Sequence, residues 1–123
     1  MVSLEEKDGL VTLRFHEPYA EPDETDYLTA LRMIETRTEP FAMLSIIGSA
    51  GHFSDAGERE QALWFKRSRL HMNLLCRAMA VVRPQVSDHM RSVFSKLWNL
   101  PVLVTTDEAE AREFLVPHLK ELA

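Results

Sequence analysis

The sequence predicts an α/β fold in which a four- to five-stranded, mostly parallel sheet begins with a β-hairpin and carries four helices, in the order ββαβαβαβα. Short apolar runs of strand length recur at residues 41–47, 78–82 and 102–106. Segments with apolar residues at helical spacing separate these runs, and strands that alternate with helices are joined by right-handed crossovers into a parallel sheet. The chain of 123 residues is expected to form one domain over residues 1–123, with a core that needs no disulfide or metal.

The N-terminal segment predicts the hairpin. Residues 2–6 and 10–15 flank Asp8-Gly9, a pair that tolerates the positive φ angles of a tight turn. Val11, Leu13 and Phe15 share one face of the second strand because side chains alternate along a strand. The hairpin is therefore expected to add an antiparallel edge to the sheet.

The first helix is predicted to begin near Asp23, an N-cap followed by acidic residues, and to end before Pro40. The second is predicted to run from Ser54 or Asp55 to about Cys76. Its inward stripe is expected to hold Leu63, Trp64, Leu70, Leu74 and Leu75.

The third helix is predicted to follow Ser87 and to be broken by Asn99 and Pro101. The last begins after Asp107, and Pro117 is expected to kink or interrupt it because proline lacks a backbone N–H.

The composition and charge of the chain argue against several functional classes of protein. The net charge of −5 argues against wholesale nucleic-acid binding, which needs clustered positive charge. A single cysteine, Cys76, cannot form an internal disulfide, which fits a reducing cytoplasm. The N-terminus has no signal-peptide pattern, and no apolar run approaches the ~18 residues of a transmembrane helix. A cytoplasmic location is therefore expected.

The segment "IIGSAGHFSDAGERE" is the best candidate for a site, because ligands bind beyond the carboxyl ends of strands in open α/β sheets. The candidate binding-loop residues are Gly48, Ser49, Gly51, His52, Ser54 and Asp55. Glycines allow close backbone approach, and a phosphate on Ser49 or Ser54 would be stabilised at a helix N-terminus. In the alternative interpretation, Ser54 only caps the helix and the glycines only turn the chain.

A second group predicts a partner or ligand face: Trp64, Arg67, His71 and Arg83. Arg67 and His71 lie one turn apart within an apolar stripe, where they either face a ligand or bind a carboxylate of the fold. Phe65, Met72 and Trp98 are expected to be exposed and to mark an interface, unless the helix phase is shifted and they belong to the core.

Catalysis and metal binding have little support. His52, Ser54 and Asp55 are sequence neighbours, whereas catalytic triads converge from separate segments, and no G-x-S-x-G elbow is present. The histidines show no metal-binding spacing, and the phosphate-loop pattern is missing. We therefore expect no catalytic residue, no metal and no cofactor.

The runs "FAMLSIIG", "CRAMAVV", "MRSVFSKLW" and "PVLVTTDEAEAREFL" resemble the SpoIIAA-like proteins, over about residues 10–115. This bacterial family groups with the STAS domains and, more distantly, with the CRAL-TRIO lipid-binding fold. The resemblance implies a non-enzymatic regulatory module. It also implies phosphorylation at Ser54, since related anti-sigma-factor antagonists are phosphorylated on a serine at this place. Their Asp-Ser-Ser-Gly motif is replaced here by Phe53-Ser54-Asp55-Ala56-Gly57.

Two functions follow as expectations. The first is a STAS-like module that binds a protein partner, or a second copy of itself, through the 48–55 loop and the start of the second helix. The alternative is a binder of a small apolar or lipid-like ligand, with membrane association. It needs an enclosed apolar cavity of a few hundred Å³ between the sheet and the second or third helix.

Overall fold

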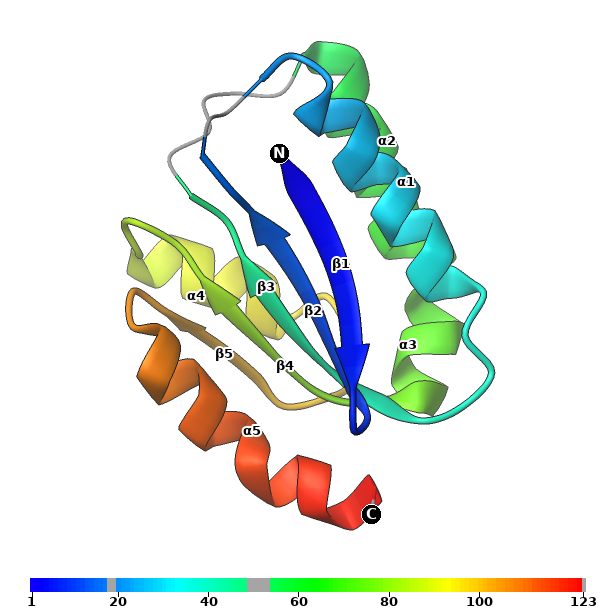
Figure 1. Cartoon of the computed structure of the whole chain (residues 1–123), viewed down its shortest axis with the longest axis vertical. Helices are drawn as coiled ribbons and strands as arrows, with labels where there is room; N and C mark the ends of the chain where they lie inside the picture. Colours follow the sequence, from blue (N-terminus) through cyan, green and yellow to red (C-terminus); the bar gives the residue numbers. More distant parts are fainter. Residues whose placement is uncertain (18–19, 49–53, 123) are drawn as a thin grey trace.

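The structure, a computed structural model, describes residues 1–17, 20–48 and 54–122. It has the predicted α/β architecture, with a five-stranded mixed sheet flanked by helices (Figure 1). In chain order the elements are β1 (Val2–Lys7), β2 (Leu10–Phe15), α1 (Asp23–Glu35), β3 (Phe41–Ile46), α2 (Asp55–Arg67), α3 (Arg69–Leu75), β4 (Cys76–Val82), α4 (Asp88–Ser95), β5 (Val102–Thr105) and α5 (Glu108–Leu122).

The strands lie side by side in chain order, β1-β2-β3-β4-β5. The β1–β2 pair is antiparallel and the other three pairs are parallel, as the sequence predicts. Asp8 and Gly9 adopt the positive φ angles of the hairpin turn, 53° and 86°. Because successive parallel strands are neighbours, right-handed crossovers place α1 to α4 on one face of the sheet. The chain reaches the other face only with α5 (Figure 1).

The larger core lies between the sheet and α1 to α4. Its strand residues alternate, as Val11, Leu13 and Phe15 do in β2, and all three are buried. Trp64, Phe65 and Trp98 form an aromatic cluster with ring centroids 5.7 to 5.8 Å apart. The indole N–H of Trp98 donates to the Phe65 carbonyl oxygen at 3.3 Å.

The predicted phase of the second helix is wrong. Met72 and Trp98 are buried and Phe65 is half-buried, whereas Leu63, Leu70 and Leu74 are exposed. The aromatic cluster explains the difference, because the helix turns Trp64 and Phe65 toward Trp98, a residue distant in sequence. The patch of Phe65, Met72 and Trp98, expected as a partner or homodimer interface, is therefore part of the core.

Five helices are present in the described part of the chain, one more than predicted, because the second divides into α2 and α3 at Ser68. The break is slight. Ser68 keeps right-handed backbone angles, and the helical hydrogen bonds Ser68 N to Trp64 O and Met72 N to Ser68 O, both 2.8 Å, continue through it.

The first helix begins at Asp23 as predicted, but two details of the helices differ from expectation. Pro22, not Asp23, is the N-cap of α1, and the Asp23 carboxylate instead accepts a hydrogen bond from the Ala20 N–H at 2.9 Å. Pro117 does not interrupt α5, which runs from Glu108 to Leu122 with the proline inside it.

Candidate functional site

The sheet face that carries α5 is only half covered. The helix packs on β3, β4 and β5, where the fully buried Ala42, Ala78 and Ala80 let it approach closely. In the described part of the chain, no helix packs over most of the outer face of the β1–β2 hairpin (Figure 1). This side of the hairpin therefore forms an open trough with α5 as one wall.

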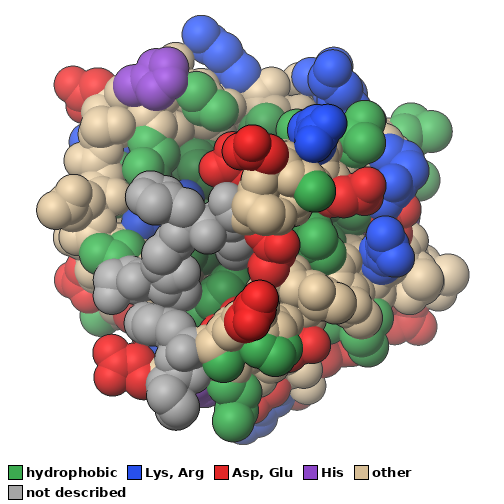
Figure 2. Space-filling view, turned by 90° about the horizontal axis from the view of Figure 1, so that it is seen from above, with side chains coloured by type: hydrophobic (Ala, Val, Ile, Leu, Met, Phe, Trp, Pro, Cys, Tyr) green, Lys and Arg blue, Asp and Glu red, His purple; other side chains and the backbone are tan. Residues whose placement is uncertain are grey.

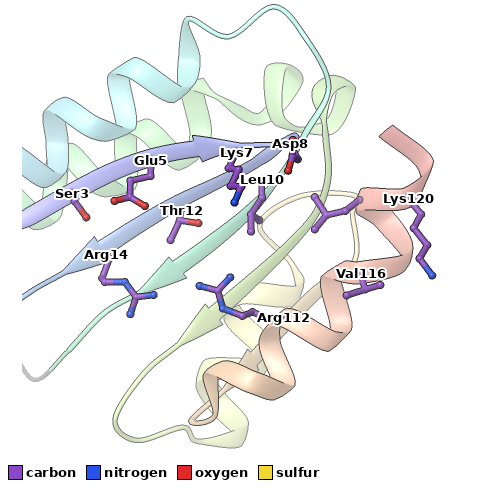
Figure 3. Close-up of a pocket in the computed structure, with 11 residues that line it drawn as sticks. Ser3, Glu5, Lys7, Asp8, Leu10, Thr12, Arg14, Arg112, Val116 and Lys120 are labelled. Atoms are coloured by element: carbon purple, nitrogen blue, oxygen red, sulfur yellow. The ribbon is translucent and has the colours of Figure 1, made fainter. Parts of the chain in front are cut away.

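The trough has a volume of about 510 Å³, which is within the range of small-ligand sites. Its lining comes from the side of the hairpin that faces away from the larger core, and from the near side of α5 (Figure 3). The lining residues are Ser3, Glu5, Lys7, Asp8, Leu10, Thr12, Arg14, Arg112, Val116, Leu119 and Lys120.

Two arginines mark one end of the trough, and one carboxylate orients both. Arg14 of β2 donates to both carboxylate oxygens of Glu108 in α5, at 2.9 and 3.1 Å. Arg112, one turn further along α5, donates through Nε to the same carboxylate at 2.9 Å. A bidentate guanidinium–carboxylate pair fixes geometry as well as charge.

The triad of Arg14, Glu108 and Arg112 keeps its charges at physiological pH. Hydrogen bonds from Arg14, and then from Arg112, hold the pKa of Glu108 at about 2, below its ordinary value of 4.5. Glu108 is consequently ionised at any physiological pH. With one carboxylate for two guanidinium groups, the triad keeps a net positive charge.

The triad also retains capacity to bind. Within the described residues, the terminal nitrogens of Arg112 have no hydrogen-bond acceptor, and the Arg112 side chain is 47% exposed. Figure 3 shows the Arg14 and Arg112 guanidinium groups directed toward each other across the trough. The Glu108 carboxylate already occupies the space between the two guanidinium groups. An anionic group beside the terminal nitrogens of Arg112 would accept hydrogen bonds from them.

The rest of the trough lining combines apolar and charged side chains. Leu10, Val116 and Leu119 supply apolar surface beyond the triad, and Lys7 and Lys120 supply cations there. Glu5 and Asp8 are the acids of the lining, so cations outnumber acids in a chain whose net charge is −5. This arrangement can hold a ligand with acidic groups and an apolar portion between them.

The loop singled out in the sequence is only partly visible. Ser49, Gly51 and His52 lie outside the described residues. Gly48 follows β3 and is half-buried, and Asp55 is the exposed first residue of α2. The statements about phosphate or partner binding by residues 49–53 therefore stay predictions.

Ser54 caps α2, as the simpler interpretation predicts. Its hydroxyl oxygen accepts from the Gly57 N–H at 3.0 Å. The same hydroxyl donates to Glu24 Oε2 at 2.9 Å, and the Ser54 N–H donates to Glu24 Oε1. A carboxylate of α1 therefore already occupies the helix start where an anionic ligand was expected. Acidic side chains also gather at this end of the molecule (Figure 2).

The predicted partner or ligand face is not a shared surface. Trp64 is buried in the core, with 2% of its surface exposed, so it is not accessible to a protein partner. Arg67 binds the Glu35 carboxylate, with Nη2 to Oε1 at 2.6 Å. His71 donates through Nε2 to the Ile34 carbonyl at 3.1 Å. Arg67 and His71 thus tie α2 and α3 to α1.

Arg83 lies at the carboxyl end of β4 and is half-buried. Its N–H donates to the Thr105 carbonyl at 3.0 Å, which joins the ends of β4 and β5. Its positive charge acts on the buried Tyr27, although desolvation dominates and raises the pKa of that phenol to about 12. The Tyr27 hydroxyl accepts a hydrogen bond from Gln61 at 2.7 Å.

The interior offers little space for a ligand. The cavity lined by Tyr27, Met43, Trp64 and neighbouring residues, between the sheet and α2, has a volume of only about 10 Å³. A site for a drug-sized ligand is typically larger by a factor of about thirty or more. The described part of the chain therefore gives the apolar-ligand alternative no cavity at this place.

The described residues offer few groups suited to nucleophilic catalysis or metal binding. Burial raises the pKa of the Cys76 thiol to about 12, so this cysteine is no nucleophile. In residues 1–17, 20–48 and 54–122, no group of three or more His, Cys, Asp or Glu side chains is arranged to hold a metal ion. None of the helices in those ranges is both long enough and apolar enough to cross a membrane.

Comparison with known proteins does not place the chain in a family. No family model matches it, and neither a curated protein nor a solved structure matches it.

Sequence reasoning missed the trough. The signals were present: Thr12 and Arg14 point away from the core face of β2, and Glu108 and Arg112 are spaced one turn apart. What the sequence does not reveal is that α5 packs on β3 to β5 and touches the hairpin only near its two ends, through Glu108 and Leu122. That placement depends on where a single helix settles on a five-stranded sheet.

Proposed function

We propose that this protein is a non-enzymatic binding module that holds an acidic segment of a protein partner in the trough between the β1–β2 hairpin and α5. The observation that supports it most is the triad of Arg14, Glu108 and Arg112, in which one ionised carboxylate orients two guanidinium groups toward an open volume of about 510 Å³. Guanidinium pairs of this kind recognise carboxylates.

The shape favours a peptide segment over a small metabolite. The trough is open along the sheet. Arg14 and Arg112 lie at one end, Lys7 and Lys120 lie on opposite walls further along, and Leu10, Val116 and Leu119 supply apolar surface. A segment in which acidic and apolar residues alternate would satisfy these side chains.

The resemblance of the sequence to the SpoIIAA-like and STAS modules supports a regulatory role of this type in a bacterial cytoplasm. Phosphorylation of Ser54 belongs to the same proposal. The side chain lies at an exposed helix start and its hydroxyl binds Glu24. A phosphate there would repel the Glu24 carboxylate and release the link between α1 and α2. Intact-mass analysis of protein from its native host tests this part.

Fluorescence anisotropy tests the main proposal, with a labelled peptide of about ten residues that alternates glutamate and leucine as the probe. Arg112→Gln is expected to weaken binding about tenfold or more, since it removes a charge-assisted contact. Arg14→Gln is also expected to weaken binding, because it removes a positive charge and leaves the Glu108 carboxylate with Arg112 alone. Lys96→Gln, which removes an exposed cation outside the trough, is the matched control and should bind as the unmodified protein does. No binding, or equal loss in all three variants, would contradict the proposal.

A further inference from the structure

The outer side of α2 and α3 carries apolar side chains that the core does not use. Leu63, Leu70 and Leu74 are 54%, 80% and 66% exposed. Helical hydrogen bonds continue through Ser68, so the two helices share one phase. Trp64, Ser68 and Met72 are buried on the side that faces the sheet. The three leucines therefore lie together on the opposite side.

Exposed cations lie near these leucines, and one of them, Arg69, donates through Nε to the Leu97 carbonyl at 3.4 Å. Lys66, Arg69 and Arg77 are exposed, and Arg77 donates to the Leu74 carbonyl at 3.0 Å, which places its guanidinium beside that leucine. From residue 61 to residue 82 the chain contains no Asp or Glu, although its net charge is −5. Glu60 lies one turn before Leu63 in the sequence, and Glu35 of α1 is paired with Arg67.

The charge and the shape of this outer surface of α2 and α3 indicate which partner binds it. We propose that the basic leucine face, formed by Leu63, Leu70, Leu74, Lys66, Arg69 and Arg77, binds the surface of a membrane rich in anionic lipid. Leucines with cations at their flanks are the pattern of helices that lie in the lipid–water interface. The leucines protrude from a convex helix surface, which suits insertion between lipid head groups.

This face and the trough lie on opposite sides of the sheet, because α2 and α3 cover one face and the trough opens on the other. Membrane binding through α2 and α3 would leave the trough accessible. The two proposals therefore stand or fall separately.

Cosedimentation with large unilamellar vesicles tests the inference. The probes are vesicles of phosphatidylcholine alone and vesicles with about 30% phosphatidylglycerol, whose surface charge attracts basic residues. We expect binding to the anionic vesicles only, and weaker binding as salt is raised. Leu70→Ser and Leu74→Ser should each lower the partition coefficient about tenfold. Arg69→Gln and Arg77→Gln should each lower it about fivefold.

Met33→Ser is the matched control, because Met33 is 56% exposed on α1 and lies outside the basic leucine face. It should bind vesicles as the unmodified protein does. All the altered leucines are exposed, and circular dichroism will show whether each variant remains folded. Absence of binding to anionic vesicles, equal binding to neutral ones, or no effect of the leucine variants would overturn the proposal. So would binding of an acidic peptide at this face in place of lipid.

Discussion

The carboxylate of Glu24 in α1 lies against Gly57 in the first turn of α2, in space that a side chain on residue 57 would occupy. A β-carbon built on Gly57 would overlap Oε1 and Cδ of Glu24. The absence of a side chain at residue 57 lets this carboxylate reach Ser54 and close the start of α2. A glycine in a first helical turn, normally unfavourable, is thereby explained.

A double-mutant cycle at these residues is expected to show strong coupling. Gly57→Ala should lower the free energy of unfolding while Glu24 is present, because the new methyl group displaces the carboxylate from Ser54. In a Glu24→Ala background the same change should raise it by about 0.5–1 kcal/mol through helix propensity. Urea unfolding measures both. Additive effects of the two substitutions would show that Glu24 does not hold this position.

The phase of α2 and α3 gives a second prediction. Met72→Ala should lower the free energy of unfolding by about 2–5 kcal/mol, because Met72 is fully buried. Leu70→Ala should change it by less than about 0.5 kcal/mol, because Leu70 is 80% exposed. Thermal or chemical unfolding distinguishes the two. A larger loss at Leu70 than at Met72 would restore the phase expected from the sequence.

The strands were predictable because continuous apolar runs such as residues 41–46 fit only a position covered on both sides, and this strand is central in the sheet. The helix phase was not. Apolar residues lie all around residues 63–75, so the pattern alone allows more than one buried stripe. Tertiary packing decides, through the contact of Trp64 and Phe65 with the distant Trp98.

The Ser54 cap was predictable from local sequence, because it needs only the neighbouring Gly57 N–H. Its second partner, Glu24, was not predictable, since the contact depends on how α1 packs beside α2. The Arg14–Glu108 pair was likewise not predictable, because it joins residues 94 positions apart in sequence.

The free energy of unfolding should depend on pH through the ionisation of Glu108. Its folded-state pKa of about 2 is depressed from 4.5, so its ionised form favours folding at neutral pH. That contribution is complete above about pH 4.5 and is lost as the pH falls toward 2. Glu108→Gln should therefore show a smaller decline in unfolding free energy between pH 4.5 and 2, measured by urea titration at each pH. Equal declines in both proteins would contradict the assignment.

Cys76 should be unreactive in the native state. The thiol is buried and donates to the Ala78 carbonyl at 3.3 Å, and its pKa is raised to about 12. Modification by a thiol reagent such as DTNB should occur only with the unfolding of the protein, so that its rate rises steeply with urea. Rapid stoichiometric labelling without denaturant would show that Cys76, at the start of β4, is accessible to the reagent in the folded protein.

The central claim is that the trough beside α5 is the binding surface. Its most direct test is a ¹⁵N chemical-shift titration with the acidic peptide of alternating glutamate and leucine. We expect shifts to concentrate on the trough face of β1 and β2 and on α5, above all at Thr12, Arg14 and Arg112. Shifts confined to Gly48, Ser54 and the start of α2, with the hairpin unaffected, would contradict it.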